Sequence, residues 1–211
     1  SNLNNISVSS SEIVVGSMSR HCDVASSSDI KATLPALAKL AGGIGDHMVR
    51  SCGTIGGSLA NNDPAACYPS AVLGLGATVV TNERSITADD FFEGMFETAL
   101  NEDEIITEVK FPIPEKASYI KFPNPASRYA MVGVFVAKKA SGVSVAVTGA
   151  GENGVFRCIE IENALNSSFS EEAIDNIDIS PDGLNSDIHA SAAYRANLIK
   201  EMAKRAVQEI S

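Results

Sequence analysis

Residues 50–66 of the chain read RSCGTIGGSLANNDPAA. They overlap a glycine-rich run, residues 41–57, in which six of the seventeen residues are glycine. Because Gly56 and Gly57 lack Cβ atoms, successive backbone N–H groups can converge there on phosphate oxygens, with the hydroxyls of Thr54 and Ser58 as further donors. An isolated Gly-Gly pair more often forms a tight structural turn. The residues around this pair instead favour a loop that holds a pyrophosphate group without a lysine.

Strands and helices are predicted on both sides of this loop from the spacing of apolar residues. The predicted strands cover residues 6–8, 13–16, 77–81, 104–111, 118–122, 131–140 and 143–148. Asp29 is predicted to cap a helix that Pro35 kinks or splits. Pro64 is predicted to open an apolar helix that ends at Gly76, and the last helix is predicted over residues 189–209.

Two prolines, Pro112 and Pro114, follow the strand over residues 104–111 and mark a predicted domain boundary. They divide the chain into a first domain, residues 1–114, and a second domain, residues 115–211. The last three strands are separated by short turns, so we expect them to form an antiparallel three-stranded sheet accompanied by helices. The predicted fold class is α+β.

A second glycine-rich segment, residues 149–154 with the sequence GAGENG, matches the G-x-G-x-x-G pattern of a dinucleotide-binding loop. That loop needs its third glycine in the first turn of a helix, whereas residues 155–157 favour an extended segment. Glu152 would also place a carboxylate beside the phosphates. We therefore expect a turn after a strand here, without a bound nucleotide.

Composition and charge exclude several classes of protein. The 211-residue chain has a net charge of −10, a pI of about 4.7 and a mean hydropathy of +0.07, which argues against a nucleic-acid partner. No apolar run approaches the roughly 20 residues that span a bilayer, and the first residues lack the features of a signal peptide, so we expect a cytoplasmic protein. The four cysteines and three histidines lack the spacing of metal sites, and the cysteines are predicted to be reduced and mostly buried.

The glycine-rich loop and its surroundings resemble the FAD-binding medium subunit of the molybdenum hydroxylases, the carbon monoxide dehydrogenase and xanthine dehydrogenase family. The segments that carry this resemblance are 44–46, 49–50, 53–60 and 63–66, with support from 15–18, 90–92, 103–109, 121–122 and 186–195. It implies an FAD-binding domain of the vanillyl-alcohol-oxidase type, here its second subdomain, followed by the C-terminal domain of the family.

The resemblance also implies which residues bind the cofactor. These are Leu40, Thr54, Ile55, Gly56, Gly57, Ser58, Cys67, Ile106, Lys121 and Tyr129. Residues 54–58 would hold the pyrophosphate and ribityl chain, Leu40 and Tyr129 would lie near the flavin ring, and Ile106 would lie near the adenine. Lys121 would contact the cofactor, but it could equally be a solvated strand lysine. Tyr129 could likewise be a core residue with a hydrogen-bonded hydroxyl.

Two features depart from the family pattern. Cys67 stands where the family usually has an aspartate that accepts hydrogen bonds from flavin hydroxyls, and a thiol is a weak acceptor. Family members also begin with a subdomain that carries another double-glycine loop, and no counterpart of it precedes Ile6. Because a diphosphate site with one side missing loses several charge-assisted hydrogen bonds, we expect this chain alone to bind FAD weakly.

The resemblance implies an oxidoreductase subunit. Its FAD would receive electrons through the 2Fe-2S clusters of a small partner subunit, which take them from a molybdopterin-binding large subunit, and would pass them to an external acceptor. No side chain of this chain would need to act as an acid or base. Two alternatives stay open: an assembly or interaction subunit that keeps the fold without tight FAD binding, and an anion- or nucleotide-binding module that uses residues 54–58.

Overall fold

A five-stranded antiparallel sheet forms the first part of the computed structural model, which describes residues 3–211. Its strands, in the order β1-β2-β7-β3-β4, are β1 Ile6–Val8, β2 Glu12–Gly16, β7 Ile106–Pro112, β3 Thr78–Thr81 and β4 Ser85–Thr87. β2 and β3 both run antiparallel to β7, which lies between them, so they are parallel to each other. Apolar side chains alternate along β2 and β7, which buries one face of the sheet in the core.

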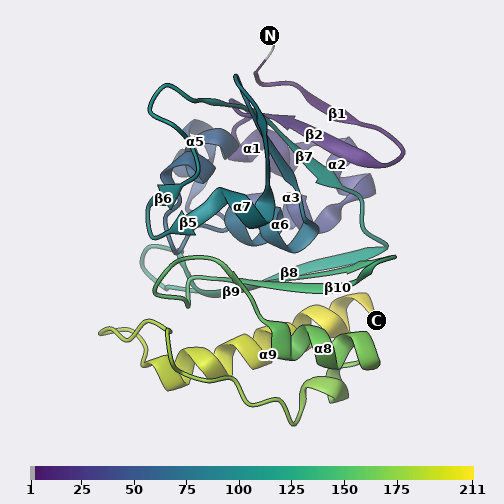
Figure 1. Ribbon diagram of the computed structural model, residues 1–211, viewed down its shortest axis with the longest axis vertical. Coiled ribbons are helices and arrows are strands. Elements are labelled where there is room, and N and C mark those ends of the chain that lie inside the picture. Colours follow the sequence, from purple (N-terminus) through teal and green to yellow (C-terminus); the bar gives the residue numbers. More distant parts are fainter. Residues whose placement is uncertain (1–2) are drawn as a thin grey trace.

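A series of helices connects β2 to β3 (Figure 1). They are α1 His21–Ser26, α2 Ser28–Thr33, α3 Pro35–Gly42, α4 His47–Cys52, α5 Ile55–Asn61 and α6 Tyr68–Leu75. Pro35 opens α3 and separates it from α2, as predicted. The predicted cap at Asp29 is wrong, because the Ser27 side chain accepts the hydrogen bond from the Ile30 amide, at 3.3 Å.

Two further features of this helical segment differ from the prediction. α4 lies within the glycine-rich run, where a regular helix is unfavourable, because Asp46 caps it and accepts a hydrogen bond from the Val49 amide at 2.9 Å. α6 begins at Tyr68 and not at Pro64, because Asp63 accepts a hydrogen bond from the Ala65 amide, at 2.8 Å, and closes a turn first. Both differences bear on the site, since the ends of these helices surround it.

A small hairpin, which the sequence patterns did not predict, follows the short helix α7, Ala88–Phe91. It consists of β5, Phe92–Gly94, and β6, Glu97–Thr98. Asn62, in a left-handed conformation at the end of α5, holds it by donating hydrogen bonds to the carbonyl groups of Gly94, at 2.8 Å, and Glu97, at 2.9 Å.

A second antiparallel sheet, in the order β11-β10-β9-β8, comes after this hairpin in the chain. Its strands are β8 Lys116–Pro123, β9 Ala130–Lys139, β10 Gly142–Thr148 and β11 Phe156–Arg157. The prediction of three strands is wrong, because the turn over residues 149–154 returns the chain so that β11 pairs with β10. The last elements are α8 Ile159–Ser167, the 3₁₀ helix η1 Glu171–Ile174 and α9 Ala192–Ile210, which starts three residues later than predicted because Asp187 first closes a turn.

This second sheet is covered on both faces, with α3 and α6 on one side and α8 and α9 on the other (Figure 1). Consecutive residues of β9 therefore face different cores. Phe135 and Ala137 belong to the core shared with the first sheet, whereas Val134 and Val136 belong to the core beneath α9. The two parts of the chain thus share an apolar interface along one face of the sheet.

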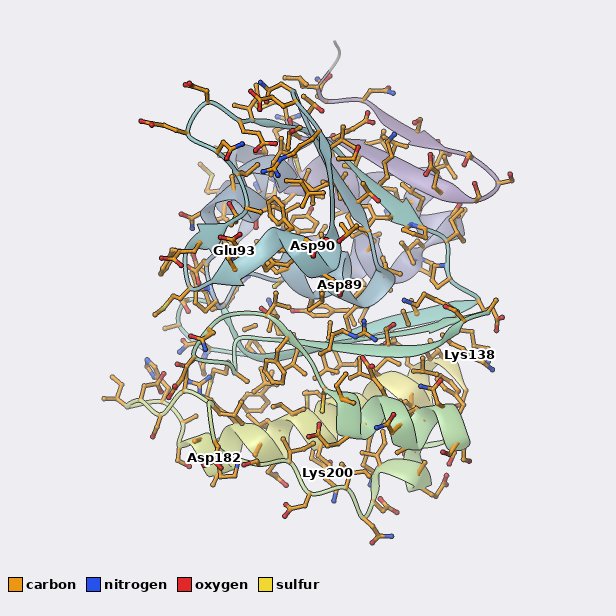
Figure 2. The ribbon with its side chains drawn as sticks, in the orientation of Figure 1. Asp89, Asp90, Glu93, Lys138, Asp182 and Lys200 are labelled. Atoms are coloured by element: carbon orange, nitrogen blue, oxygen red, sulfur yellow. The ribbon has the colours of Figure 1, made fainter. Side chains whose placement is uncertain are left out.

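Asp89, Asp90 and Glu93 are exposed around α7, and Lys138 and Lys200 are partly exposed near the C-terminal helices (Figure 2). Glu104, Glu162 and Arg195 are buried. Within residues 3–211, no helix combines the length and the apolar character needed to cross a membrane.

Candidate functional site

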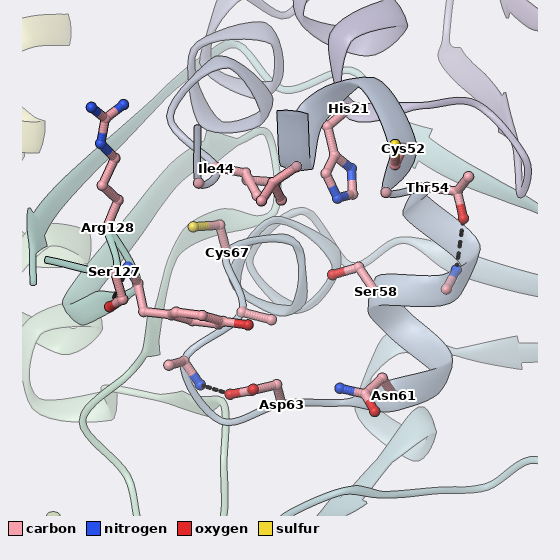
Figure 3. A pocket seen from close by; sticks show the side chains of 17 residues that line it. His21, Ile44, Cys52, Thr54, Ser58, Asn61, Asp63, Cys67, Ser127 and Arg128 are labelled. Atoms are coloured by element: carbon pink, nitrogen blue, oxygen red, sulfur yellow. Dashed lines mark hydrogen bonds between the residues drawn. The ribbon is translucent and has the colours of Figure 1, made fainter. Parts of the chain in front are cut away.

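A cavity of about 480 Å³ opens beside the N-terminal half of α5. The segment 63–67 and the loop 127–129 form its other walls (Figure 3). Thr54, Gly57, Ser58, Cys67 and Tyr129, all predicted site residues, line it together. The cavity is also lined by residues that the sequence analysis did not single out as site residues, which are His21, Ile44, Gly45, Val49, Cys52, Gly53, Asn61, Asp63, Ala65, Ala66, Ser127 and Arg128.

The backbone of the glycine loop is arranged differently from the predicted anion-binding loop. The amides of Ile55 and Gly56 donate hydrogen bonds to the carbonyl groups of Ser19, at 3.1 Å, and Ser17, at 2.8 Å. The Gly57 amide donates to Thr54 Oγ1 at 3.2 Å, which caps α5. The expected convergence of free N–H groups is therefore absent at Ile55 and Gly56, because the neighbouring segment 17–19 already accepts their hydrogen bonds. The donors that remain at this wall are the hydroxyls of Thr54 and Ser58.

The two adjacent glycines meet different surroundings. A Cβ atom at Gly56 would lie 2.6 Å from Ser17 Cβ, so Gly56 is needed for the close approach of α5 to the segment after β2. A Cβ atom at Gly57 would meet Thr54 Oγ1 at 3.1 Å and no other described atom within 4 Å. Gly57 is exposed and leaves open space next to the cavity.

A second, smaller cavity of about 210 Å³ lies on the other side of Gly57. Its lining is mainly apolar and includes the predicted residue Ile106; the lining residues are Ser17, Met18, Gly56, Gly57, Ala60, Leu100, Glu104, Ile105 and Ile106. Gly57 lines both cavities. The two cavities thus border a single residue that has no side chain.

Of the remaining predicted residues, Leu40, Ile55 and Lys121 line neither cavity. Leu40 is completely buried in the first core. The Lys121 ammonium group donates hydrogen bonds to the carbonyl groups of Gly43, at 2.5 Å, and Arg128, at 2.9 Å, and it lies 3.6 Å from Cys67 Sγ. Lys121 therefore links the cavity-lining residue Arg128 to Gly43 at the end of α3. Tyr129 is half exposed, so it is not a core residue.

His21 is a lining residue that the sequence analysis missed, since a lone histidine carries no local pattern that distinguishes a site residue from a core residue. Its side chain is 5% exposed, and burial, with a smaller effect of the positive charge of Arg50, lowers its pKa to about 4. The imidazole is therefore neutral at pH 7. Charged groups at the cavity are the Arg128 guanidinium and the Asp63 carboxylate.

The other glycine-rich segment, residues 149–154, is the predicted turn. It leads into strand β11, and neither cavity beside Gly57 includes any of its residues. The Gly149 amide donates to the Pro64 carbonyl at 2.8 Å, and Arg195 donates to the Gly149 carbonyl at 3.1 Å. This turn therefore supports the cavity wall formed by the segment after Pro64, although it does not line the cavity.

The positions of the cysteine, histidine and acidic side chains bear on disulfide formation and metal binding. All four cysteines are free thiols; Cys67 and Cys158 are buried, Cys22 is partly buried and Cys52 is exposed, so the prediction of mostly buried thiols holds for two of them. Within residues 3–211, no group of three or more histidine, cysteine or acidic side chains is placed to hold a metal ion.

Comparison with known proteins now identifies the family. Residues 1–114 match the model of the family described as the FAD binding domain in molybdopterin dehydrogenase. The chain is 30% identical over 226 residues to the glyceraldehyde dehydrogenase medium chain of Sulfolobus acidocaldarius, an alignment that covers 99% of this chain and 79% of the relative. It is 34% identical over 208 residues to the nicotine 6-hydroxylase medium subunit of Paenarthrobacter nicotinovorans, covering 92% of this chain and 73% of the relative.

Solved structures agree with these relatives. The reconstituted CO dehydrogenase from Oligotropha carboxidovorans matches with a TM-score of 0.86 and 25% identity, over 98% of this chain and 77% of that chain. Quinoline 2-oxidoreductase from Pseudomonas putida 86 matches with a TM-score of 0.84 and 27% identity, over the same shares of the two chains. The chain therefore belongs to the FAD-binding domain family of the molybdopterin dehydrogenases, as a medium, FAD-binding subunit of the molybdenum hydroxylase type.

Proposed function

We propose that this chain holds FAD across the two cavities that meet at Gly57 and serves as the electron-transferring flavoprotein subunit of a molybdenum-containing dehydrogenase. The observation that carries this proposal is the pair of cavities, of about 480 and 210 Å³, that border one glycine beside two hydroxyl donors. A dinucleotide has two ring systems joined by a pyrophosphate, so it requires two lobes and a narrow, polar crossing between them.

The residues of each lobe fit the corresponding part of FAD. In the crossing, the open space at Gly57 and the hydroxyls of Thr54 and Ser58 suit the pyrophosphate and ribityl chain. The smaller, apolar lobe with Ile106 suits the adenine, and the larger lobe with Tyr129 suits the flavin. Gly56 lines the smaller lobe, Ile55, Leu40 and Lys121 line neither lobe and would act through the residues that do, and Cys67 lines the larger lobe.

The chain's own residues bind and orient the cofactor in this proposal. FAD, when bound, supplies reversible two-electron and one-electron chemistry, and the protein sets its position and surroundings. Lys121 holds the loop before Tyr129 against the segment after α3 through its bonds to the Arg128 and Gly43 carbonyls. We assign no acid-base role to a side chain at this site, because electron transfer through FAD requires none.

The same proposal extends to partners and domain organisation. Relatives of this chain are named medium chains and medium subunits, which implies larger assemblies for those proteins. We propose a small partner with 2Fe-2S clusters as the electron donor, a large molybdopterin-binding partner that oxidises the substrate, and a cytoplasmic location. We also propose that residues 1–114 and 115–211 are separate domains. A subunit without flavin is not favoured, because the matching family is one of FAD-binding domains.

Titration of the purified protein with FAD, followed through the change in the visible absorption spectrum of the flavin, tests this function. Saturable binding, of the weak affinity expected from the sequence, is the predicted result. Gly57→Val is the matched variant, because its side chain would fill the crossing between the lobes, and it should lose this binding while its far-UV circular dichroism is kept. A wild-type protein that does not bind FAD at any concentration tested, or a Gly57→Val variant that binds FAD as the wild type does, would contradict the proposed site.

A further inference from the structure

His21 projects into the larger cavity from the start of α1. Figure 3 shows its ring beside Ile44 and facing Ser58, with the Cys67 sulfur turned away from it. The side chain is only 5% exposed, so its position is determined by packing. The cavity therefore contains a buried polar ring that belongs to none of the sequence motifs around it.

The ring of His21 is held in one place by its neighbours. Its backbone amide donates to the Gly53 carbonyl at 3.0 Å, and a Cβ atom at Gly53 would lie 2.5 Å from Nε2. The ring also packs on Tyr68, with 5.3 Å between the ring centroids. Gly53 is thus required for the imidazole to occupy this position beside the glycine loop.

The polar atoms in this neighbourhood lack partners. His21 Nδ1, Tyr68 OH and Ser19 Oγ are all buried, and none has a hydrogen-bond partner among residues 3–211. Buried polar side-chain atoms in proteins almost always have a partner. Because Nδ1 is closed off from the cavity, the ring nitrogen left for a ligand is Nε2, which lies beside the cavity-lining residue Gly53.

The charge state of the imidazole restricts that ligand. Burial lowers the His21 pKa to about 4, so at pH 7 the ring is neutral and has one N–H donor and one acceptor nitrogen. A neutral ring offers a phosphate group no charge, but it suits an uncharged hydroxyl, imide or carbonyl group. In FAD such groups belong to the ribityl chain, the isoalloxazine ring and the ribose of the ADP half, and the larger cavity that His21 lines is the one assigned to the flavin half.

We propose that His21 is a cofactor-contacting residue whose imidazole forms a hydrogen bond with the flavin-ribityl half of FAD in the larger cavity. This inference rests on the proposed function. It adds a specificity-determining residue, because the contact distinguishes FAD from nucleotides that share only its ADP half. Cys67 is a weak acceptor on the opposite side of the cavity, so His21 provides a stronger polar contact for this half.

The test compares the binding of FAD, riboflavin and ADP to the wild type and to three variants of the purified protein. His21→Leu removes the hydrogen bond and keeps an apolar group of similar reach, whereas His21→Gln keeps an amide donor and acceptor. His47→Gln on the exposed helix α4 is the matched control, since His47 does not line the cavity. Dissociation constants come from flavin fluorescence quenching and, for ADP, from calorimetry.

We expect His21→Leu to weaken FAD and riboflavin binding about tenfold, the effect of losing one hydrogen bond, and to leave ADP binding within about twofold of the wild type. His21→Gln should recover most of the flavin affinity, and His47→Gln should match the wild type. Melting temperatures of the ligand-free variants show whether each one folds. If His21→Leu does not fold, His21→Phe, which keeps a planar ring and lacks both ring nitrogens, takes its place in the comparison of FAD with ADP.

Each other result overturns the inference. Equal losses of FAD and ADP affinity would show that His21 only packs the wall, and unchanged FAD affinity in His21→Leu would show that no hydrogen bond forms. In both cases the proposed function stands, because the wild type still binds FAD. A wild-type protein that binds neither FAD nor ADP overturns the proposed function and this inference together.

Discussion

The glycine-rich loops over residues 53–58 and 149–154 differ in the element that each one enters and in the groups that approach each one. The first leads into helix α5 and borders two cavities, whereas the second leads into strand β11 and borders neither. In the second loop, protein groups come close to Gly149 and Gly151, and the Arg195 guanidinium bonds to the Gly149 carbonyl. A glycine pattern thus indicates only that something comes close to the backbone.

The same distinction separates the neighbouring glycines of the first loop. Gly56 is approached by Ser17 of the protein itself, and Gly57 borders the space that we assign to the cofactor. One glycine therefore serves folding and the next serves binding. Substituting each glycine by alanine tests whether it serves folding or binding. The added methyl group is large enough to block a close approach to the backbone and is otherwise a small change.

The largest expected effect comes from Gly149→Ala. The new Cβ would lie 2.3 Å from the Ala130 carbonyl oxygen, and the residue would have to keep a φ of +82°. Left-handed strain and a clash with backbone together should cost about 3 kcal/mol or more of the free energy of unfolding. Urea denaturation followed by circular dichroism measures this cost. A loss below about 1 kcal/mol would show that the loop is not held as tightly as the hydrogen bonds around it indicate.

Gly56→Ala should rank second, with a loss of about 2 kcal/mol, because its Cβ would overlap Ser17 Cβ at 2.6 Å and the Ser17 carbonyl oxygen at 2.8 Å. The same urea titration applies. Ser17→Gly in the same chain removes one of the two overlapping atoms, so the double variant should recover part of the loss. No recovery would place the cause of the destabilisation elsewhere in α5.

How far the sequence predicts these features depends on whether the pattern is local. Strands β2, β7 and β9 were predicted because each carries a run of alternating or continuous apolar residues. Residues 155–157 were predicted to be extended, but β11 was not predicted as a fourth strand, because two residues contain too little pattern and its pairing depends on the turn before it. Helix α4 was missed because its glycine-rich surroundings conceal the cap at Asp46.

The candidate site divides in the same way. Thr54, Gly57 and Ser58 were predicted because they belong to one continuous motif, and they do line one cavity. His21 and Arg128 come from distant segments that meet the motif only in three dimensions, so no spacing within the sequence indicates them. The internal bonds of the Ile55 and Gly56 amides were also unpredictable, since their acceptors lie in the segment after β2.

A smaller effect, which depends on pH, is expected at the first loop because His21 packs against Gly53. The His21 pKa is about 4 in the folded protein, below its ordinary value of 6.5, so below pH 6.5 the unfolded chain binds a proton that the folded protein does not. Stability should therefore fall as the pH is lowered from 6.5 towards 4, by on the order of 1 kcal/mol after solvent screening. Urea titrations at several pH values measure this contribution, and His21→Gln should reduce the slope. An unchanged slope in that variant would assign the pH dependence to other groups.

The smallest effect on folding, and the sharpest form of the comparison, comes from Gly57→Ala beside Gly154→Ala. At Gly57 the added methyl group meets only Thr54 Oγ1, and alanine favours the helix, so the free energy of unfolding should change by less than about 0.5 kcal/mol. The methyl group nevertheless enters the crossing between the two cavities, and FAD affinity should fall about tenfold.

At Gly154 the nearest atom to a Cβ is 3.9 Å away, but the φ of +98° should cost about 1 kcal/mol and leave FAD affinity unchanged. Fluorescence titration with FAD and urea denaturation of both variants give the four values needed. The crossed result, with binding lost in one variant and stability lost in the other, is expected only if the first loop borders a ligand and the second does not; parallel changes in both variants would remove the distinction between the loops.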